Sequence, residues 1–346
     1  MSLIAPIAAQ ASDSINLEGM NSYSRSPKKS SSKRINSNTF INKVNEDLAT
    51  KESSIDDQNI FEAGSFSDTT TMDGKAIFTV GSVETEDAFD PKTYDGKVMA
   101  NYTYQMNVNT SFNGDDNLYI RLKTGNGAGW MAEADEGGYL SSNNSGADEI
   151  HVDKLWYTFP IGERQTVWVG PRIENYYMHA TTPSLYSPTL KQFTLGGNAA
   201  AYGASTNSGV GYAYKFDNGL AFSSNLVSKQ NGGNNGFLTK ESEHSWATQV
   251  GYTQEQYSVS AILNNKYNGW EDGYFSTQTG AGRVSGDSTN IGLRAWVRPE
   301  ETGSAIPSIS VGYDTSTIQY GADTVDSTNM WFAGFGWADI FQAEDK

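Results

Sequence analysis

The sequence predicts an all-β protein, an antiparallel transmembrane β-barrel of which about twelve strands are visible. Three observations support this fold class: a two-residue alternation of apolar and polar side chains, a regular change between short and long connections, and an unusual composition. Of the 346 residues only 37% are hydrophobic, whereas there are 35 Gly and 19 Tyr residues. Tyr suits a pleated surface and Gly suits turns. A barrel with a wet interior needs only one apolar face per strand, which explains the low hydrophobic fraction.

The clearest alternation extends over Lys97–Phe112. Val98 and Tyr102 fall on one face of this segment, and Asn101 and Gln105 fall on the other. Successive side chains of a strand point to opposite sides of the sheet, so the segment has one apolar and one polar surface. It also exceeds the roughly 10 residues that a tilted strand needs to cross a bilayer. The segment therefore predicts a membrane strand.

The alternation recurs along the chain from Lys75 onward. It is found in Leu118–Lys123, Val167–Arg172, Val210–Phe216, Trp246–Thr253, Tyr257–Leu263, Asn290–Arg298, Ile309–Tyr313 and Met330–Trp337. Tight turns are expected at Phe112–Asp116, Phe216–Gly219 and Thr253–Gln256, and long loops at Gly125–Ala147, Glu174–Ser208, Ser228–Glu243 and Asn268–Ser288. Short turns at one end and long loops at the other are typical of outer-membrane barrels, although soluble sandwiches produce the same rhythm.

Aromatic side chains are expected at the ends of the strands. In a membrane barrel such residues form girdles at the two interfaces, where amphipathic rings are most stable. The candidates for these girdles are Tyr102, Tyr104, Phe112, Trp156, Tyr157, Phe159, Phe216, Phe222, Trp331 and Phe335.

Composition excludes several classes of function. A net charge of −16 argues against nucleic acid as a partner, because phosphate binding needs clustered Lys and Arg. The chain has no Cys, which excludes disulfides and thiolate metal sites. His151, His179 and His244 share no metal-ligand spacing, so no metal site is predicted. No catalytic residue, cofactor or enzymatic activity is predicted either, because the acidic residues at 133, 135 and 136 are interpreted as a solvated loop rather than a glycosidase carboxylate pair.

The chain divides into three regions. Residues 1–11 end in Ala9-Gln10-Ala11, which matches the small-x-small cleavage pattern of an export signal, and are interpreted as a signal peptide remnant. Residues 12–74 are rich in Ser, Asn, Asp and Lys, without a lasting apolar period, and are interpreted as a largely disordered N-terminal segment. Residues 75–346 are predicted to form the β-barrel domain.

Basic side chains on the polar face of the predicted strands are candidates for lining a pore. They are Lys97, Arg121, Lys123, Arg172, Lys215, Arg294 and Arg298. Charge rings set the selectivity of pores, and basic side chains would favour anions or neutral polar solutes. The alternative is that they only solvate the interior, or pair with loop acids such as Glu174 and Asp314. The segment Glu174–Ser208, which contains Pro183 and Pro188, is expected to fold inward as a constriction.

Five stretches occur in an order typical of one protein family. They are Leu3–Ser24, Phe66–Val80, Tyr104–Gly125, Val152–Gly162 and Asn329–Phe341. Together they resemble cyanobacterial outer-membrane porins related to the carbohydrate-selective porin family, some of which are labelled iron-uptake porins. The resemblance implies a passive pore in the cell outer membrane for small hydrophilic solutes and inorganic ions, with outer-membrane lipids as partners. Because trimers are common among porins, it also implies a homotrimer.

Two features depart from this family. Its members usually carry a surface-layer-homology domain and a coiled coil that anchor them to peptidoglycan, and residues 25–65 show neither pattern. The family's barrel also continues past the stretch that resembles Asn329–Phe341, whereas this sequence stops at Lys346. The sequence therefore predicts a barrel that is incomplete at its C-terminus. A fragment, a shortened natural form and closure by another polypeptide all remain open.

Three functions are compatible with the sequence. The favoured one is a passive outer-membrane porin, with transport of ions and of carbohydrates as the two solute classes. The alternative is an exported, soluble, β-rich carbohydrate-binding protein or glycosidase that stacks its aromatic rings on sugars. The third is a closed barrel without a continuous pore, which serves as an outer-membrane scaffold. Partition between membrane and buffer distinguishes the second function from the other two.

Overall fold

The computed structural model describes residues 69–84, 96–127, 131, 140–144, 146–197, 199–202, 206–229, 236–268, 287–301, 303, 305–319 and 327–340. The predicted signal peptide remnant and residues 12–68 of the predicted N-terminal segment lie outside these residues, as does the acidic group at 133–136. The first strand begins at Thr70, so β structure starts before the domain boundary that was expected at Lys75.

Twelve antiparallel strands form one sheet, in which each strand pairs with the next strand along the chain. They are β1 (Thr70–Gly81), β2 (Met99–Thr110), β3 (Asn117–Gly125), β4 (His151–Ile161), β5 (Gln165–Ile173), β6 (Asn207–Lys215), β7 (Leu220–Ser228), β8 (His244–Thr253), β9 (Tyr257–Tyr267), β10 (Ser288–Val297), β11 (Ser308–Ile318) and β12 (Ser327–Gly336). The predicted all-β, antiparallel fold class is confirmed. Each predicted short turn and long loop joins two neighbouring strands of the sheet.

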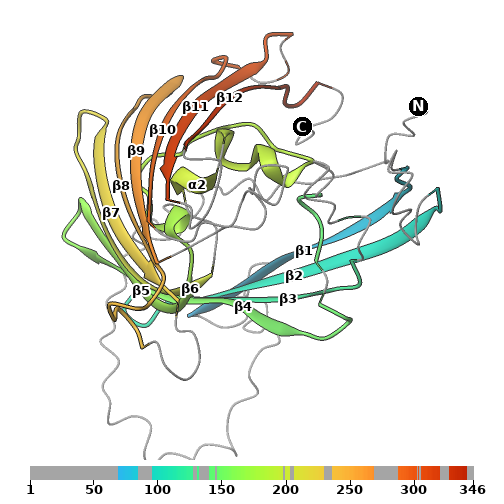
Figure 1. The fold of residues 1–346 in the computed structure, drawn as a ribbon, viewed down its shortest axis with the longest axis horizontal. Coiled ribbons are helices and arrows are strands. Elements are labelled where there is room, and N and C mark those ends of the chain that lie inside the picture. Colours follow the sequence, from blue (N-terminus) through green and yellow to red (C-terminus); the bar gives the residue numbers. More distant parts are fainter. Residues whose placement is uncertain are drawn as a thin grey trace, which may run out of the picture.

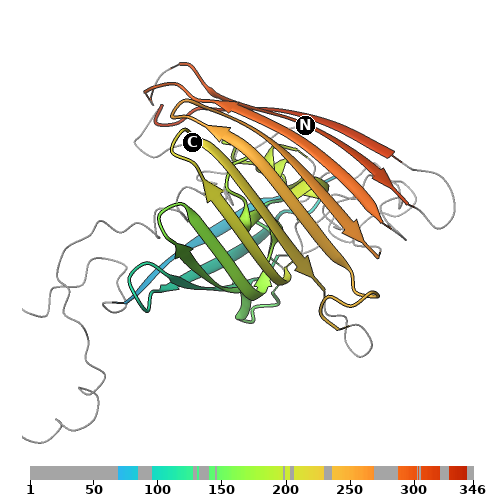
Figure 2. The same ribbon diagram turned by 90° about the vertical axis from the view of Figure 1, so that its left-hand side faces the viewer.

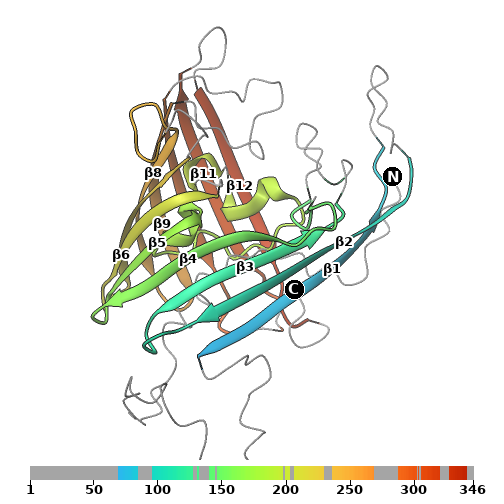
Figure 3. The same cartoon turned by 90° about the horizontal axis from the view of Figure 1, so that it is seen from below.

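The sheet is strongly curved, and its strands tilt together (Figure 2). Figure 1 shows the sheet curving around a small helix, α2, with β7–β12 on one side of it and β1–β4 on the other. The β1–β4 side faces the viewer in Figure 3. β1 and β12 are the two edge strands and do not pair with one another, so the sheet is not closed over the described residues.

The alternation places polar side chains on the buried inner face of the sheet and apolar side chains on the exposed outer face. In β9, Ser258, Ser260 and Asn264 are buried, whereas Val259 and Leu263 are exposed. A water-soluble protein has the opposite arrangement, because removal of apolar surface from water is the main favourable term in folding. The outer face of this sheet is therefore apolar where water would require it to be polar.

Large apolar side chains are exposed on the outer face of β1, β2 and β5–β12. The exposed strand residues of this apolar belt are Phe78, Val80, Tyr104, Val169, Val210, Phe222, Trp246, Val250, Val259, Leu263, Ile291, Leu293, Val297, Val311, Tyr313, Trp331 and Phe335. Contiguous apolar surface on this scale marks a contact with protein or membrane, since soluble monomers rarely expose it.

Aromatic rings gather at the end of the sheet that carries the short turns. The ring of Tyr157 lies between those of Phe112 and Phe159, with centroid distances of 6.3 and 5.7 Å. These three residues lie at the strand ends, as expected for a girdle. The same prediction is wrong for Trp156, which is 1% exposed and packs inside the sheet, 4.8 Å from the ring of Tyr177.

One carboxylate holds the tight turn between β2 and β3. Asp116 accepts hydrogen bonds from the backbone N–H groups of Phe112 and Asn113 and from the hydroxyls of Ser111 and Tyr157. Burial alone would raise the pKa of Asp116, but the four donors outweigh it and lower the pKa below its usual value. The turn sequence thus supplies both the bend and the acceptor that stabilises it.

In the described part of the chain, three helices lie in the connection between β5 and β6. They are the 3-10 helices η4 (Asn175–Met178) and η5 (Lys191–Gly196) and the α-helix α2 (Ala199–Tyr202). Among the described residues no helix has the length and apolar character needed to cross a bilayer.

Candidate functional site: two loops inside the sheet

The described residues of the β5–β6 loop, within 174–206, lie on the concave side of the sheet, so the predicted inward folding of this loop is confirmed. η4 packs on β6–β8, α2 packs on β9–β11, and η5 packs on β11 and β12. Figure 1 shows α2 surrounded by the curved sheet. The loop therefore occupies the interior on the side of β6–β12.

Glycines on the inner face of the sheet allow the loop to approach the strands closely. A Cβ atom on Gly211 would lie 2.7 Å from the Sδ of Met178, and a Cβ on Gly251 would lie 2.2 Å from the Oγ1 of Thr181. Met178 is completely buried in an apolar cluster that includes Trp156. Glycine on a strand commonly marks a close approach of another segment, and here that segment is the loop.

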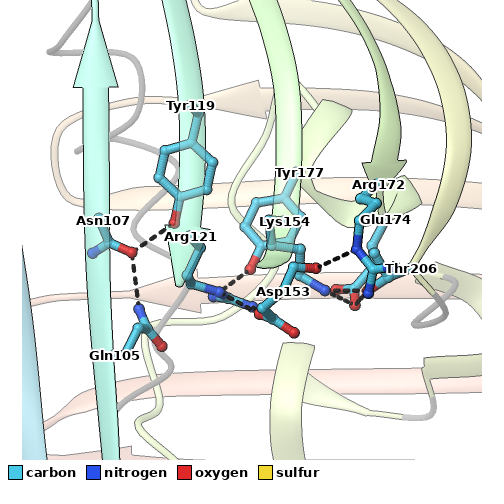
Figure 4. Close-up of polar contacts among 10 residues, drawn as sticks. All are labelled: Gln105, Asn107, Tyr119, Arg121, Asp153, Lys154, Arg172, Glu174, Tyr177 and Thr206. Carbon is cyan, nitrogen blue, oxygen red and sulfur yellow. Dashed lines mark hydrogen bonds and ion pairs between the residues drawn. The ribbon is translucent and has the colours of Figure 1, made fainter. Parts of the chain in front are cut away.

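Lys154 on β4 joins the two ends of the loop (Figure 4). Its Nζ donates to the Oε1 of Glu174, the first loop residue, and to the Oγ1 of Thr206, the last one. The Thr206 hydroxyl donates to the same Glu174 oxygen at 2.5 Å. The side chains of Lys154 and Glu174 are only 3% and 7% exposed. Because buried charges need a bonded partner, this group clamps the ends of the loop together.

A second ion pair lies beside this clamp, on β3 and β4. The Arg121 guanidinium donates to Asp153 and, at 3.0 Å, to the hydroxyl of Tyr177 in the loop. The hydroxyl of Tyr119 donates to the Oδ1 of Asn107 at 2.8 Å, which extends the polar surface onto β2. The inner face of β2–β4 therefore presents charged, amide and hydroxyl groups to the interior (Figure 4).

Arg294 on β10 holds the other half of the loop. Its Nε donates to the backbone C=O of Leu195 at 2.8 Å, and one terminal nitrogen pairs with the Oδ1 of Asp314 at 2.9 Å. The guanidinium also lies 5.1 Å from the centre of the Tyr202 ring. The Arg294 side chain is 1% exposed, so its hydrogen bonds are directed at the protein itself.

A second loop also enters the interior. Residues 140–144 of the β3–β4 connection lie over the inner side of β1 and β2, where Ser141 and Ser142 are buried. The backbone of Leu140 forms an antiparallel bridge with Leu190 of the β5–β6 loop. The two loops therefore meet inside the sheet.

His179 lies buried in the β5–β6 loop as a neutral imidazole. The Oδ1 of Asn225 accepts a bond from the Asn175 amide, so the Asn225 NH₂ group donates to the Nδ1 of His179 at 3.2 Å. Burial lowers the pKa of His179 to about 3, against a smaller opposing effect of the Tyr202 backbone. In the part of the chain that the structure describes, no His, Asp and Glu side chains gather into a metal-binding group.

We expect His179→Gln to reduce the sensitivity of the protein to acid. Between pH 6.5 and about 3 the unfolded chain binds a proton at this residue that the folded chain does not bind. Stability therefore falls as the pH falls through this window, by up to about 1.4 kcal/mol per pH unit. The free energy of unfolding in detergent at pH 7 and pH 4.5 measures the effect. A slope of stability against pH in H179Q equal to that of the wild type would contradict the expectation.

The seven basic candidates occupy different environments. Arg121 and Arg294 are buried in ion pairs, Lys123, Lys215 and Arg298 are half-buried, and Lys97 and Arg172 are exposed. A register shift between Gly170 and Ile173 interrupts the alternation of β5 and places Ile173 in the interior cluster. The neighbouring Arg172 donates to the backbone C=O of Asp153 at 3.4 Å.

Sequence reasoning missed the residues that fasten the loops, above all Lys154 and Ser141. Lys154 has a visible signal, since it is a charged residue in the aromatic-rich strand β4, but its role depends on Glu174 in the distant loop. Ser141 has no signal, because nothing in its sequence context differs from an exposed loop. The alternative that basic residues pair with acidic ones is seen for Arg294 and Asp314, although Asp314 lies on β11 rather than in a loop.

Comparisons with known proteins give partial likenesses. An uncharacterized protein of Nostoc sp. is 28% identical over 184 residues, which make up 49% of this chain and 30% of that protein, so the chain spans less than a third of it. No family model matches the chain. Among solved structures, Pseudomonas putida OprB at high pH has a TM-score of 0.44 and 10% identity, over 75% of this chain and 68% of OprB. A mutant of the Rh. blastica porin has a TM-score of 0.43 and 10% identity, over 78% of this chain and 86% of that porin.

Proposed function

We propose that the protein is an outer-membrane porin through which small hydrophilic solutes and inorganic ions diffuse passively. The observation that carries the proposal is the inverted arrangement of the two faces of the sheet. On β10 the outward Leu293 is 50% exposed, whereas the inward Asn290 and Arg294 are 2% and 3% exposed. Lipid requires an apolar outer face and backbone groups that are hydrogen-bonded within the protein. A curved antiparallel sheet provides both at the strands that lie between its two edge strands.

The exported carbohydrate-binding protein or glycosidase has less support. A sugar site inside the curved sheet needs accessible aromatic rings, but the inward Trp156, Trp168 and Trp296 are 1%, 5% and 2% exposed. It also leaves the outer apolar belt facing water, which a soluble monomer avoids. We therefore propose a channel without enzymatic activity. Membrane fractionation tests the choice, since a protein that stays in the supernatant without detergent would favour the soluble alternative.

Single-channel recording tests the proposed pore directly. Detergent-folded protein is added to a planar lipid bilayer under a salt solution. We expect discrete conductance steps, because a polar interior lets hydrated ions pass. If folded, bilayer-inserted protein gives no steps and liposomes show no solute flux, the porin proposal fails and the closed scaffold replaces it.

The charges around the ends of the loop favour anions. Four basic residues there, Arg121, Lys123, Lys154 and Arg172, outnumber the two acidic residues Asp153 and Glu174 by two. Charges on a pore wall attract ions of opposite sign. Together with the amide groups on β2, this composition suits small anions and neutral polar solutes.

Arg121→Gln should shift the ion preference of the pore toward cations. The substitution removes one positive charge and the direct ion pair of Asp153, so we expect the anion-to-cation permeability ratio to fall roughly two-fold. The reversal potential under a salt gradient measures this ratio. Arg164→Gln is a matched control, because Arg164, in the β4–β5 turn, forms an exposed ion pair with Asp217, in the β6–β7 turn. Equal reversal potentials in R121Q and the wild type would contradict the assignment.

Location and assembly belong to the same proposal. The chain would lie in the cell outer membrane, in contact with its lipids, and the resemblance to porins supports a homotrimer. Chemical cross-linking of the detergent-solubilised protein should then give a product of three copies. If cross-linking leaves only the monomer under conditions that preserve the fold, the trimer is ruled out.

A further inference from the structure

We propose that the passage is narrowed by a strap made of two loops, and that Thr103, Ser141 and Arg294 are the positioning residues that fasten it. The strap consists of residues 140–144 of the β3–β4 connection and residues 188–197 of the β5–β6 loop. It runs through the interior from β2 to β10. The inference rests on the proposed pore and deepens it, because it identifies the residues that set the width of that pore.

The first fastener holds the strap on the β1–β2 side. The Thr103 hydroxyl on β2 donates to the backbone C=O of Ser142 at 2.6 Å. Thr103 and Ser142 are 4% and 8% exposed, so this bond is shielded from water. The Ser142 hydroxyl also lies 3.5 Å from the hydroxyl of Thr79 on β1. One end of the strap is thus attached to the two strands at the first edge of the sheet.

The second fastener joins the two loops to each other. Leu140 and Leu190 form an antiparallel bridge, and the backbone N–H of Ser141 donates to the C=O of Thr189 at 2.8 Å. The Ser141 hydroxyl donates to the C=O of Pro188 at 2.7 Å. Because backbone and side chain of Ser141 both bond to the other loop, movement of one loop must displace the other.

The third fastener holds the strap on the β10–β11 side. Besides the bond from Arg294 to the Leu195 C=O, two glycines bring the strap backbone into direct contact with the wall. A Cβ on Gly197 would lie 2.3 Å from the Asp314 Oδ2 and 2.5 Å from the nearest Arg294 nitrogen. A Cβ on Gly312 would lie 1.9 Å from the C=O oxygen of Gly196. The strap therefore rests on the ion pair at a distance that only glycine permits.

The fasteners act in series, which predicts a specific result for double variants. Release of any one fastener frees the strap to move, so release of a second one should change the conductance little further. Arg294 uses its hydrogen bonds on Leu195, Asp314 and the backbone of its own wall. Its loss should therefore change the width of the passage more than the sign of its ion preference.

Conductance and reversal potential are measured for Arg294→Gln, Thr103→Val and the double variant in planar bilayers. We expect R294Q to raise single-channel conductance roughly two-fold, since conductance follows the width of a pore. The reversal potential should stay close to that of the wild type. T103V should change conductance in the same direction, and the double variant should not exceed the larger single effect. The outward Thr317→Val serves as a control for T103V and should have no effect.

Gly197→Ala provides the same release without a change of charge. Its methyl group displaces the strap from the ion pair, so we expect it to reproduce the conductance of R294Q. Gly162→Ala controls for backbone strain without a clash, because Gly162 in the β4–β5 turn has a φ of 66°, which disfavours Ala, but its Cβ would meet no atom within 4 Å. If R294Q does not fold, R294Q/D314N removes both charges together and G197A remains as an independent release.

Three results would contradict the proposed strap. The first is a double variant whose conductance change is the product of the single changes, which means that the loops act independently. The second is a shifted reversal potential in R294Q that G197A lacks, which would make Arg294 a selectivity charge. The third is unchanged conductance in all the variants of a conducting channel.

Hydrogen exchange separates failure of the strap from failure of the pore. The Ser141 amide should exchange faster in R294Q than in the wild type, because its acceptor belongs to the released loop. This readout needs no conduction. Exchange that is unchanged in R294Q contradicts the strap, and faster exchange in a protein that never conducts contradicts only the porin proposal.

Discussion

Leu293→Arg should destabilise the protein in lipid vesicles by about 2–4 kcal/mol, the cost of a basic side chain on the lipid face near the bilayer midplane. Leu293 is 50% exposed on the outer face of β10, and its register partners are Tyr313 on β11 and Ala261 on β9, so it lies in the middle of the strand. In water, a substitution at such an exposed position usually changes the free energy of unfolding by less than about 0.5 kcal/mol. The large cost thus depends on lipid outside the sheet.

Thr289→Arg is the matched control for this prediction. Thr289 is exposed on the same face of the same strand, but it lies next to the first residue of β10, at the end that carries the long loops. Near the membrane interface the cost of an Arg falls to about 0–1 kcal/mol. Reversible urea unfolding in vesicles measures both variants. Equal and small effects at the two positions would show that the apolar belt does not face lipid.

Lys154→Met should cost about 3–5 kcal/mol, because removal of one partner from a buried ion pair leaves an uncompensated charge. The carboxylate of Glu174 would keep its hydrogen bond from Thr206 but lose its cation, and its Oε2 already has no hydrogen-bond partner. The loop ends should then separate. Urea unfolding measures the cost, and limited proteolysis within residues 174–206 detects the release of the loop.

The double variant Lys154→Met/Glu174→Gln tests the cause of that loss. It removes both charges, so most of the stability should return, as is common when a buried pair is replaced as a whole. Lys229→Met is a second control, because the Lys229–Glu243 pair is about 20% exposed at both side chains. Such a pair contributes roughly 0–1 kcal/mol. A similar loss of unfolding free energy in K154M and K229M would mean that burial does not increase the contribution of the Lys154–Glu174 pair.

The two-residue alternation was sufficient to predict the strands and their polar face. Asn101, Thr103 and Gln105 on β2 and Arg294 on β10 lie on the face that was predicted to be polar, although they are buried there instead of facing water. This success has a simple cause: in a regular strand, position in the sequence alone decides which side of the sheet a residue faces. The same holds for the tight turns, whose residues interact with near neighbours.

Prediction failed where the alternation is interrupted or ambiguous. In β5 the register shift after Gly170 changes which later residues face inward, so Ile173 reaches the interior cluster. In β4, Trp156 and Tyr157 are adjacent aromatic residues on opposite faces, and the sequence does not show which of them belongs to the outer girdle. Both errors concern single residues, and neither alters the order of the strands.

By itself, the sequence determined the class of the fold, the order of short and long connections, and the polar and apolar faces of the strands. These properties depend on local periodicity, which any short segment carries within itself. Only the tertiary structure decided that two loops meet inside the sheet, that Lys154 clamps the ends of one of them, and that Arg294 holds its far half. Those contacts join residues that are distant in sequence and lie in irregular segments without a period, so they exist only once the curved sheet brings its walls around the loops.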